Sequence, residues 1–297
     1  MLPLEPLHVV AAHADPNTLT QMCLVNSVMG NIAVMYLYAD VRLTKPSVVV
    51  KCLKTMSKHS ELAKHARVLS ICLESGYPCL TSAFGKLLRR ALHHMPHLVT
   101  LELDLGGDTF VRHLRGCPFR ITNLSLACGW DPHLPAWLEE QPAILRFMLY
   151  GDHRSTVSLT PSALPKLRCI FGTPTVISTI VPGRPVKQVF VTVYSRTPFS
   201  EQVIEHLAQS CKLSTGPVDA VSVIHQNDLA PNPDEMFGIL SSIPLYLPGL
   251  KKFAMQAYSC PFNEVTTSHC PPFSIVDVRP LRLCVDRFAA SSPDSGN

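Results

Sequence analysis

The chain has 297 residues, of which 46% are hydrophobic and 16% charged, a composition typical of a globular protein rather than a disordered one. Its formal net charge is +4. The longest uninterrupted apolar run, Ile32 to Tyr38, is far shorter than the roughly 20 residues that span a bilayer, so we expect no membrane partner. Eleven cysteines without C-x-x-C pairs are typical of reduced thiols, and we expect a cytoplasmic or nuclear location.

Three short helices are predicted for the first 43 residues. Between Met29 and Tyr36, apolar residues recur every three or four positions, which is helical periodicity. Asp15 and Asn17 are the candidate capping residues for the second helix, and Asn26-Ser27 is the candidate start of the third. Because proline suits only the first helical turn, the first helix is expected to begin at Pro6. A segment this short cannot bury enough apolar surface alone, so its spare apolar face is expected to pack on the chain or on a partner.

Ten residues of this segment follow one ordered pattern: Leu2, Pro3, Glu5, Leu7, Val10, Asp15, Pro16, Leu19, Leu24 and Val25. In this pattern the segment resembles an F-box, and it departs from that family at Pro6, Ala14 and Met29. The resemblance implies a module that binds the Skp subunit of a Skp–cullin–F-box ubiquitin ligase. The positions expected to make that contact are Leu2, Pro3, Leu7, Val10, Leu19, Val25 and Met29.

From Val68 onward, a pattern of apolar-x-x-apolar-x-apolar recurs, and its last two positions alternate as in a strand. The copies are Val68/Ile71/Leu73, Leu98/Leu101/Leu103, Ile121/Leu124/Leu126, Ile144/Phe147/Leu149, Val186/Val189/Val191, Val218/Val221/Val223 and Leu250/Phe253/Met255, with a weaker one at Leu167/Ile170. A proline lies shortly before seven of these copies, at the position where a helix would end and a strand begin.

Helical patterns fill the intervals at 80–92, 200–211 and 234–243. Strand, turn and helix at this period resemble a degenerate leucine-rich repeat array. The expected fold class is therefore α/β: a short N-terminal three-helix F-box-like module, followed by an irregular right-handed α/β leucine-rich-repeat-like solenoid with a parallel sheet. The expected domains are the module at 1–43, the solenoid at 44–258, and a Pro-rich capping segment with a disordered tail at 259–297.

A basic segment runs from Arg42 to Met95, with ten Lys and Arg residues against two Asp and Glu. Lys51, Lys54 and Lys58 are spaced to share one solvated helix face. The opposite, apolar face is expected to consist of Val48, Val49, Cys52, Leu53 and Met56. No aromatic residues alternate with these cations as stacking platforms, so we expect no nucleic acid partner.

The repeat pattern also predicts a second binding surface. Residues that flank the central apolar position point away from the core, and neighbouring strands place them side by side. On this register an exposed substrate-protein surface is predicted, consisting of Arg146, Met148, Tyr150, Phe171 and Phe190. Two alternatives remain: the C-terminal tail covers these residues, or the register shifts by one and turns them inward.

Candidate catalytic residues are few, and no nucleotide, hydrolase or metalloprotease motif is present. His93, His94 and His97 lie near a predicted helix end, but Pro96 breaks the helix that a zinc pair would need. Glu102, Asp104 and Asp108 alternate along a strand, and two interpretations remain: a cation or base site on one face, or a solvated strand face, which is the commoner arrangement. We therefore expect no enzyme, no cofactor and no metal site.

Together these features predict a substrate-recognition adaptor of a Skp–cullin–F-box ubiquitin ligase, in which the helices bind the Skp subunit and the repeats bind an unknown substrate protein. The alternative is a repeat-based protein-interaction scaffold or sensor without ligase association, whose N-terminal helices only cap the solenoid. The departures from the F-box pattern favour this alternative.

Overall fold

The computed structural model describes residues 4–73, 81–105, 110–150, 159–194, 201–226, 243, 245–258 and 276–277. The fold is α/β, with a parallel sheet that is not closed into a barrel. The chain divides into two compact units, Met1–Ile144 and Leu145–Asn297. None of the described helices is long and apolar enough to cross a membrane.

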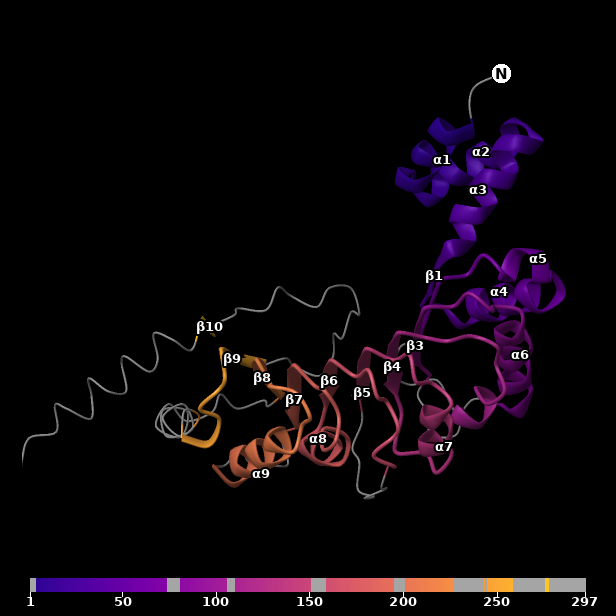
Figure 1. Ribbon diagram of the computed structural model, residues 1–297. Helices are drawn as coiled ribbons and strands as arrows, with labels where there is room; N and C mark the ends of the chain where they lie inside the picture. The colour runs from indigo at the N-terminus through magenta and orange to yellow at the C-terminus, as the bar shows by residue number, and fades with distance from the viewer. Residues whose placement is uncertain are drawn as a thin grey trace, which may run out of the picture. The chain divides into compact units, whose positions relative to one another are not determined.

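The first unit begins with three helices, α1 (Leu4–His13), α2 (Pro16–Val25) and α3 (Ser27–Ala39) (Figure 1). Of the candidate capping residues, Asp15 caps α2 and Asn26 caps α3. The Asp15 carboxylate accepts hydrogen bonds from the backbone N–H groups of Asn17 and Thr18 at 2.8 and 3.1 Å. The Asn26 side chain accepts one from the Met29 N–H at 2.9 Å. The predicted start of the first helix at Pro6 is wrong: the helix begins two residues earlier, because first-turn N–H groups have no partner within a helix and Pro6 therefore loses nothing there.

Four parallel strands follow, paired in chain order. They are β1 (Asp40–Leu43), β2 (Val68–Cys72), β3 (Thr100–Asp104) and β4 (Asn123–Ala127). The connections contain α4 (Pro46–Lys58), α5 (Ser60–Ala63), α6 (Ser82–His93), the 3-10 helix η1 (Val111–His113) and α7 (Leu134–Glu139). Figure 1 shows α4 and α6 on the same side of these strands. Strands β2 to β4 fall where the repeat pattern predicts them, whereas β1 lies at the end of the predicted helical module, where the sequence pattern predicts no strand.

The core of the first unit lies between these strands and helices. The predicted alternation is confirmed, since Leu101 and Leu103 on β3 are fully buried while their neighbours are half-exposed. In α4, Val49, Leu53 and Met56 are fully buried, as the basic-face pattern predicts. The sequence pattern also predicts Val48 on that apolar face, but Val48 is 44% exposed.

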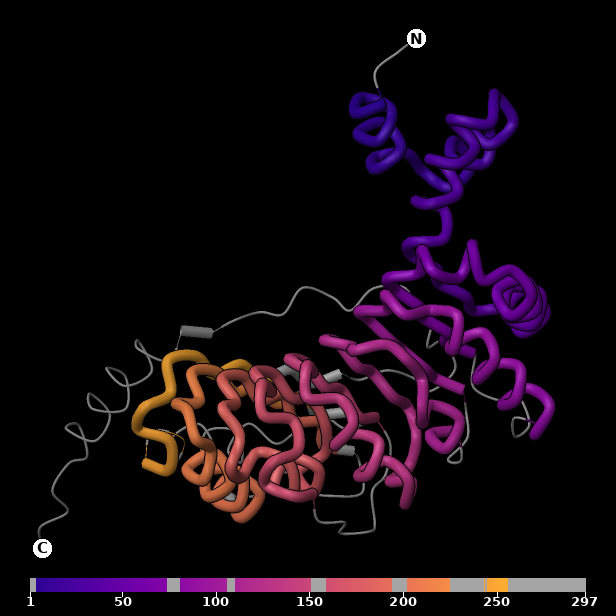
Figure 2. Tube along the Cα trace, turned by 45° about the vertical axis from the view of Figure 1, so that its right-hand side comes forward, coloured from indigo at the N-terminus to yellow at the C-terminus, as the bar shows by residue number. Residues whose placement is uncertain are grey.

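The second unit contains strands β5 (Arg146–Tyr150), β6 (Cys169–Gly172), β7 (Gln188–Tyr194), β8 (Ala220–Gln226) and β9 (Lys252–Tyr258), with β10 (Val276–Asp277). Strands β5 to β9 are parallel and paired in chain order, and β10 is antiparallel to β9. Helices α8 (Pro174–Ile180) and α9 (Glu201–Lys212) belong to this unit. Figure 2 shows its successive turns lying side by side in chain order.

The strands of the second unit also follow the predicted register, with Phe147, Ile170 and Val189 fully buried on successive strands. The predicted helices at 80–92 and 200–211 correspond to α6 and α9. The predicted helix at 234–243 lies outside the described residues, apart from its last position. The short β10 falls within the Pro-rich capping segment predicted after residue 258.

A buried arginine holds one loop of the second unit to α8. Arg184 is 1% exposed, and its guanidinium donates hydrogen bonds only to backbone carbonyls. The acceptors are Thr160 and Ala163 before β6, and Ile180 and Pro182 at the end of α8. Burial lowers the pKa of Arg184 from its usual value. The carbonyls at the C-terminal end of α8 thus receive the donors that the helix itself cannot supply.

Candidate protein-interaction surfaces

The helical module has a small core of its own. Its buried members are Ala11, Leu19, Met22, Ile32 and Ala33. Helices α2 and α3 approach each other closely at Gly30. A Cβ atom at this position would lie 3.3 Å from the carbonyl oxygen of Cys23. This core occupies the contact between the three helices, and the apolar side chains on their other faces lie outside it.

The module exposes a large number of apolar side chains. Among the described residues, seven of the eleven exposed large hydrophobic residues lie on α1, α2 and α3: Leu4, Val9, Val10, Leu24, Val25, Val28 and Met35. Leu24 and Val25, at the corner between α2 and α3, are 77% and 62% exposed, and Val10 on α1 is 56% exposed. Seven exposed apolar side chains on three short helices make the module a candidate interaction site.

The residues predicted for the Skp contact do not all lie on this surface. Val10 and Val25 do, whereas Leu7 and Met29 are half-buried against the module's core. Leu19 is 5% exposed, so its prediction as a contact residue is corrected: it is a core residue, held between helices by its own module. Leu2 and Pro3 lie outside the described residues.

Sequence reasoning missed four members of the exposed apolar surface: Leu4, Val9, Val28 and Met35. All four are apolar residues within helices α1 and α3, so the apolar pattern of the sequence alone does not separate them from core positions.

The predicted substrate surface in the second unit is assembled by the strands β5, β6 and β7. The register pairs Arg146 with Cys169 and Met148 with Phe171, and then Phe171 with Phe190. Arg146 is exposed, and Met148, Tyr150 and Phe190 are half-buried. These four residues and Phe171 therefore lie together on the sheet face opposite the one that carries the buried Phe147, Ile170 and Val189. The described strands show no shift of register.

Phe171 requires a correction, because it is only 6% exposed and cannot be a contact residue as predicted. Its ring packs against that of Tyr150, with centroids 4.6 Å apart and planes inclined at 41°. In the strand register Phe171 lies between Met148 on β5 and Phe190 on β7, so it is a buried member of the same sheet face.

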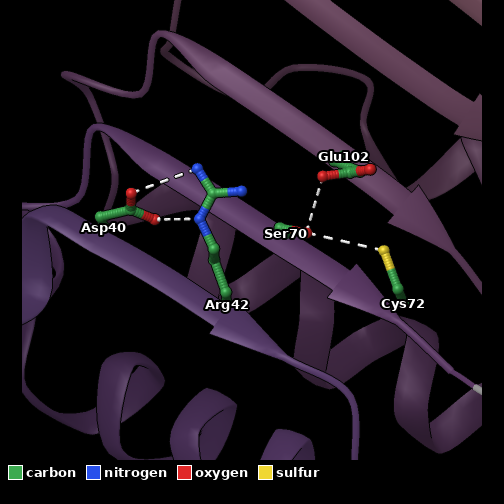
Figure 3. A network of polar contacts seen from close by, with 5 residues as sticks. All are labelled: Asp40, Arg42, Ser70, Cys72 and Glu102. Carbon is green, nitrogen blue, oxygen red and sulfur yellow. Dashed lines mark hydrogen bonds and ion pairs between the residues drawn. The ribbon is translucent and has the colours of Figure 1, made fainter. Parts of the chain in front are cut away.

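The same sheet face of the first unit is polar (Figure 3). On β1 the Asp40 carboxylate and the Arg42 guanidinium form two contacts at 3.0 and 3.2 Å. On β2, Ser70 is buried and donates a hydrogen bond from Oγ to Oε2 of Glu102 on β3 at 2.8 Å. The Cys72 thiol lies 3.6 Å from the same Oγ.

This polar network lacks an activated nucleophile. Ser70 Oγ is hydrogen-bonded to the Glu102 carboxylate and the Cys72 thiol, and no histidine takes part in the described network. Burial raises the pKa of Cys72, and the charges of Glu102 and Asp104 raise it further, so its thiol stays protonated at neutral pH. Asp108, the third acid predicted along this face, lies outside the described residues.

The predicted histidine cluster is divided among different partners. His93 Nδ1 lies 2.9 Å from the Arg89 carbonyl oxygen, and His94 Nδ1 lies 3.2 Å from the Met56 carbonyl oxygen. Helix α6 ends at His93, as expected from Pro96. The described residues contain no group of three or more His, Cys, Asp or Glu side chains that could hold a metal ion.

No family model matches this chain, and no curated protein matches it either.

Proposed function

We propose that this protein is a substrate-recognition adaptor of a Skp–cullin–F-box ubiquitin ligase. In this proposal α1, α2 and α3 act as an F-box-like module that binds the Skp subunit. The strand and helix units that follow act as a leucine-rich-repeat-like solenoid that holds the substrate protein. The observation that carries the proposal is the concentration of exposed apolar side chains on the module, which matches the need of an F-box for a partner.

The energetic argument rests on the cost of leaving these side chains in water. Burying a Val or Leu side chain contributes about 1.5–3 kcal/mol relative to leaving it exposed. Val10, Leu24 and Val25 are each more than half exposed, so a partner that covers them gains several such contributions. The adaptor itself needs no bond chemistry, cofactor or metal, because it acts by raising the local concentration of substrate near the ligase. Its proposed location is the cytoplasm or the nucleus.

The substrate-binding role is assigned to the outer face of β5, β6 and β7. Arg146, Met148, Tyr150 and Phe190 combine a cation with large apolar and aromatic groups, which are the residue types enriched at the centres of protein interfaces. Phe171 supports them and makes no direct contact in this proposal.

The test is co-purification of the full chain with a purified Skp subunit. Val10→Asp with Val25→Asp places two charges on the exposed apolar surface without touching the module's core, and should abolish the co-purification. The control is Leu213→Asp with Val48→Asp, since Leu213 is as exposed as Val25, at 62%, and lies in the second unit. The control variant should bind like the wild type.

Two results would contradict the proposal. A wild-type chain that leaves the Skp subunit unbound would favour a repeat-based scaffold or sensor without ligase association. A Val10→Asp, Val25→Asp variant that binds as well as the wild type would show that the exposed apolar surface is not the contact.

A further inference from the structure

Helices α4 and α6 carry their cations on exposed faces. Lys51, Lys54 and Lys58 are all exposed on α4. On α6, Lys86, Arg89 and Arg90 are exposed and occupy positions i, i+3 and i+4 of one helix face. Neither helix contains an aspartate or a glutamate. We call these six residues the basic helical face.

The two helices that carry these cations are neighbours. Helices α4 and α6 follow successive parallel strands and lie side by side in Figure 1. Their C-terminal ends meet where His94 Nδ1 lies 3.2 Å from the carbonyl oxygen of Met56. The next element, η1, adds the exposed Arg112 beside α6.

The positive charge of this surface is not neutralised within the described part of the chain. Glu61 on the neighbouring α5 is already paired with Lys64, and Glu140 pairs with Arg115 at 3.6 Å. The six cations of the basic helical face form no ion pair among the described residues. Like charges also lie close together at the edge of this face. Burial lowers the pKa of His113, and the positive charges of Arg112 and Arg89 lower it further.

We propose that the basic helical face binds an acidic polypeptide segment of a partner protein. This inference does not rest on the proposed ligase function, since the face lies on the helices of the first unit and includes no residue of the F-box-like module. A negatively charged segment would relieve the repulsion among six clustered cations, and the attraction would weaken with added salt.

Three observations favour a polypeptide over nucleic acid. Val48, 44% exposed, lies one turn before Lys51 on α4 and offers an apolar contact that a phosphate backbone does not use. The face is built by two adjacent helices, each about 10 Å across, whereas a DNA major groove about 12 Å wide admits one. Neither helix exposes an aromatic ring on which a base could stack, since Phe84 is half-buried.

The experiment measures binding of the full chain to a fluorescent peptide rich in glutamate and leucine, by fluorescence anisotropy at low and at physiological ionic strength. A short DNA duplex carrying the same dye is measured beside it. The charge-reversal variant is Lys54→Glu, Lys58→Glu, Arg90→Glu. Its matched control is Lys166→Glu, Arg168→Glu, Lys212→Glu, three exposed cations of the second unit that change the net charge equally.

The expected result is peptide binding that weakens with salt, falls about tenfold in the basic-face variant, and changes less than about twofold in the control. The variant Lys54→Gln, Lys58→Gln, Arg90→Gln should show an intermediate loss of peptide binding. It replaces the charge-reversal variant in the test if circular dichroism shows the charge-reversal variant to be unfolded. Equal losses in the test and control variants would overturn the proposal, because net charge alone would explain them. Tighter binding of the duplex than of the peptide would overturn it in favour of nucleic acid.

Discussion

The Nε atom of Arg184 donates a hydrogen bond to the carbonyl oxygen of Ala163 at 2.8 Å, across a separation of 21 residues. The same guanidinium reaches the carbonyls of Thr160, Ile180 and Pro182. An arginine is suited to this position because its planar group presents five donors in fixed directions. The side chain therefore joins the loop before β6 to the end of α8.

Arg184→Met should lower the free energy of unfolding of the second unit by about 3 kcal/mol, because buried carbonyls lose their donors. The measurement is urea unfolding followed by far-ultraviolet circular dichroism. Tryptophan fluorescence is unsuited to it, since both tryptophans, Trp130 and Trp137, lie in the first unit. Arg168→Met, at an exposed arginine of the same unit, serves as the control and should change stability little. Equal effects of the two substitutions would contradict the assigned role of Arg184.

Gly85→Ala should destabilise the first unit by about 1–2 kcal/mol, because an added methyl group meets a neighbouring ring. A Cβ atom at Gly85 would lie 2.8 Å from Cε1 of His113 and closer still to Nε2. Urea unfolding followed by tryptophan fluorescence measures this effect, since Trp137 is fully buried in the same unit.

The sign of the Gly85 effect should reverse when His113 is truncated. In a His113→Ala background the space is open, and Gly85→Ala should stabilise the chain by up to about 1 kcal/mol through its higher helix propensity. A Gly85→Ala effect that is the same in both backgrounds would show that the two residues do not interact.

The stability of the second unit should decrease at alkaline pH through Cys211. Burial raises the pKa of this thiol from 9.0 to about 12, so the folded state holds the proton more tightly than the unfolded state. The resulting stabilisation is complete below the unfolded pKa and is lost as the pH rises from about 9 towards 12, by about 1.4 kcal/mol per pH unit.

The contribution of Cys211 is isolated by comparing the wild type with Cys211→Ala. Urea unfolding followed by circular dichroism should show a smaller decrease in the variant between pH 9 and pH 11, since the variant lacks this titration. Parallel pH profiles for the two proteins would contradict the prediction.

Much of the strand arrangement could be predicted because period-two alternation is local. Leu101 and Leu103 alternate with polar neighbours, and that pattern alone places them on the buried face of a strand. The caps Asp15 and Asn26 could also be predicted, because a capping hydrogen bond joins residues only two or three positions apart.

The first strand could not be predicted in the same way. Asp40–Leu43 has four residues and follows α3 without a break, so its apolar residues continue the helical pattern of the preceding segment. What makes it a strand is its pairing with β2, whose partners lie 28 residues further along the chain.

The candidate surfaces were likewise predictable only in part from the sequence. By itself, the sequence determined which side of its own helix or strand each side chain occupies, since that depends only on the helical or extended period. It could not separate Leu19 from Val25, or Phe171 from Met148, because burial depends on what packs over the position. Only the tertiary structure decided that Leu19 lies in the core of the helical module and Val25 in water, and that Phe171 is buried between its neighbours on β5 and β7.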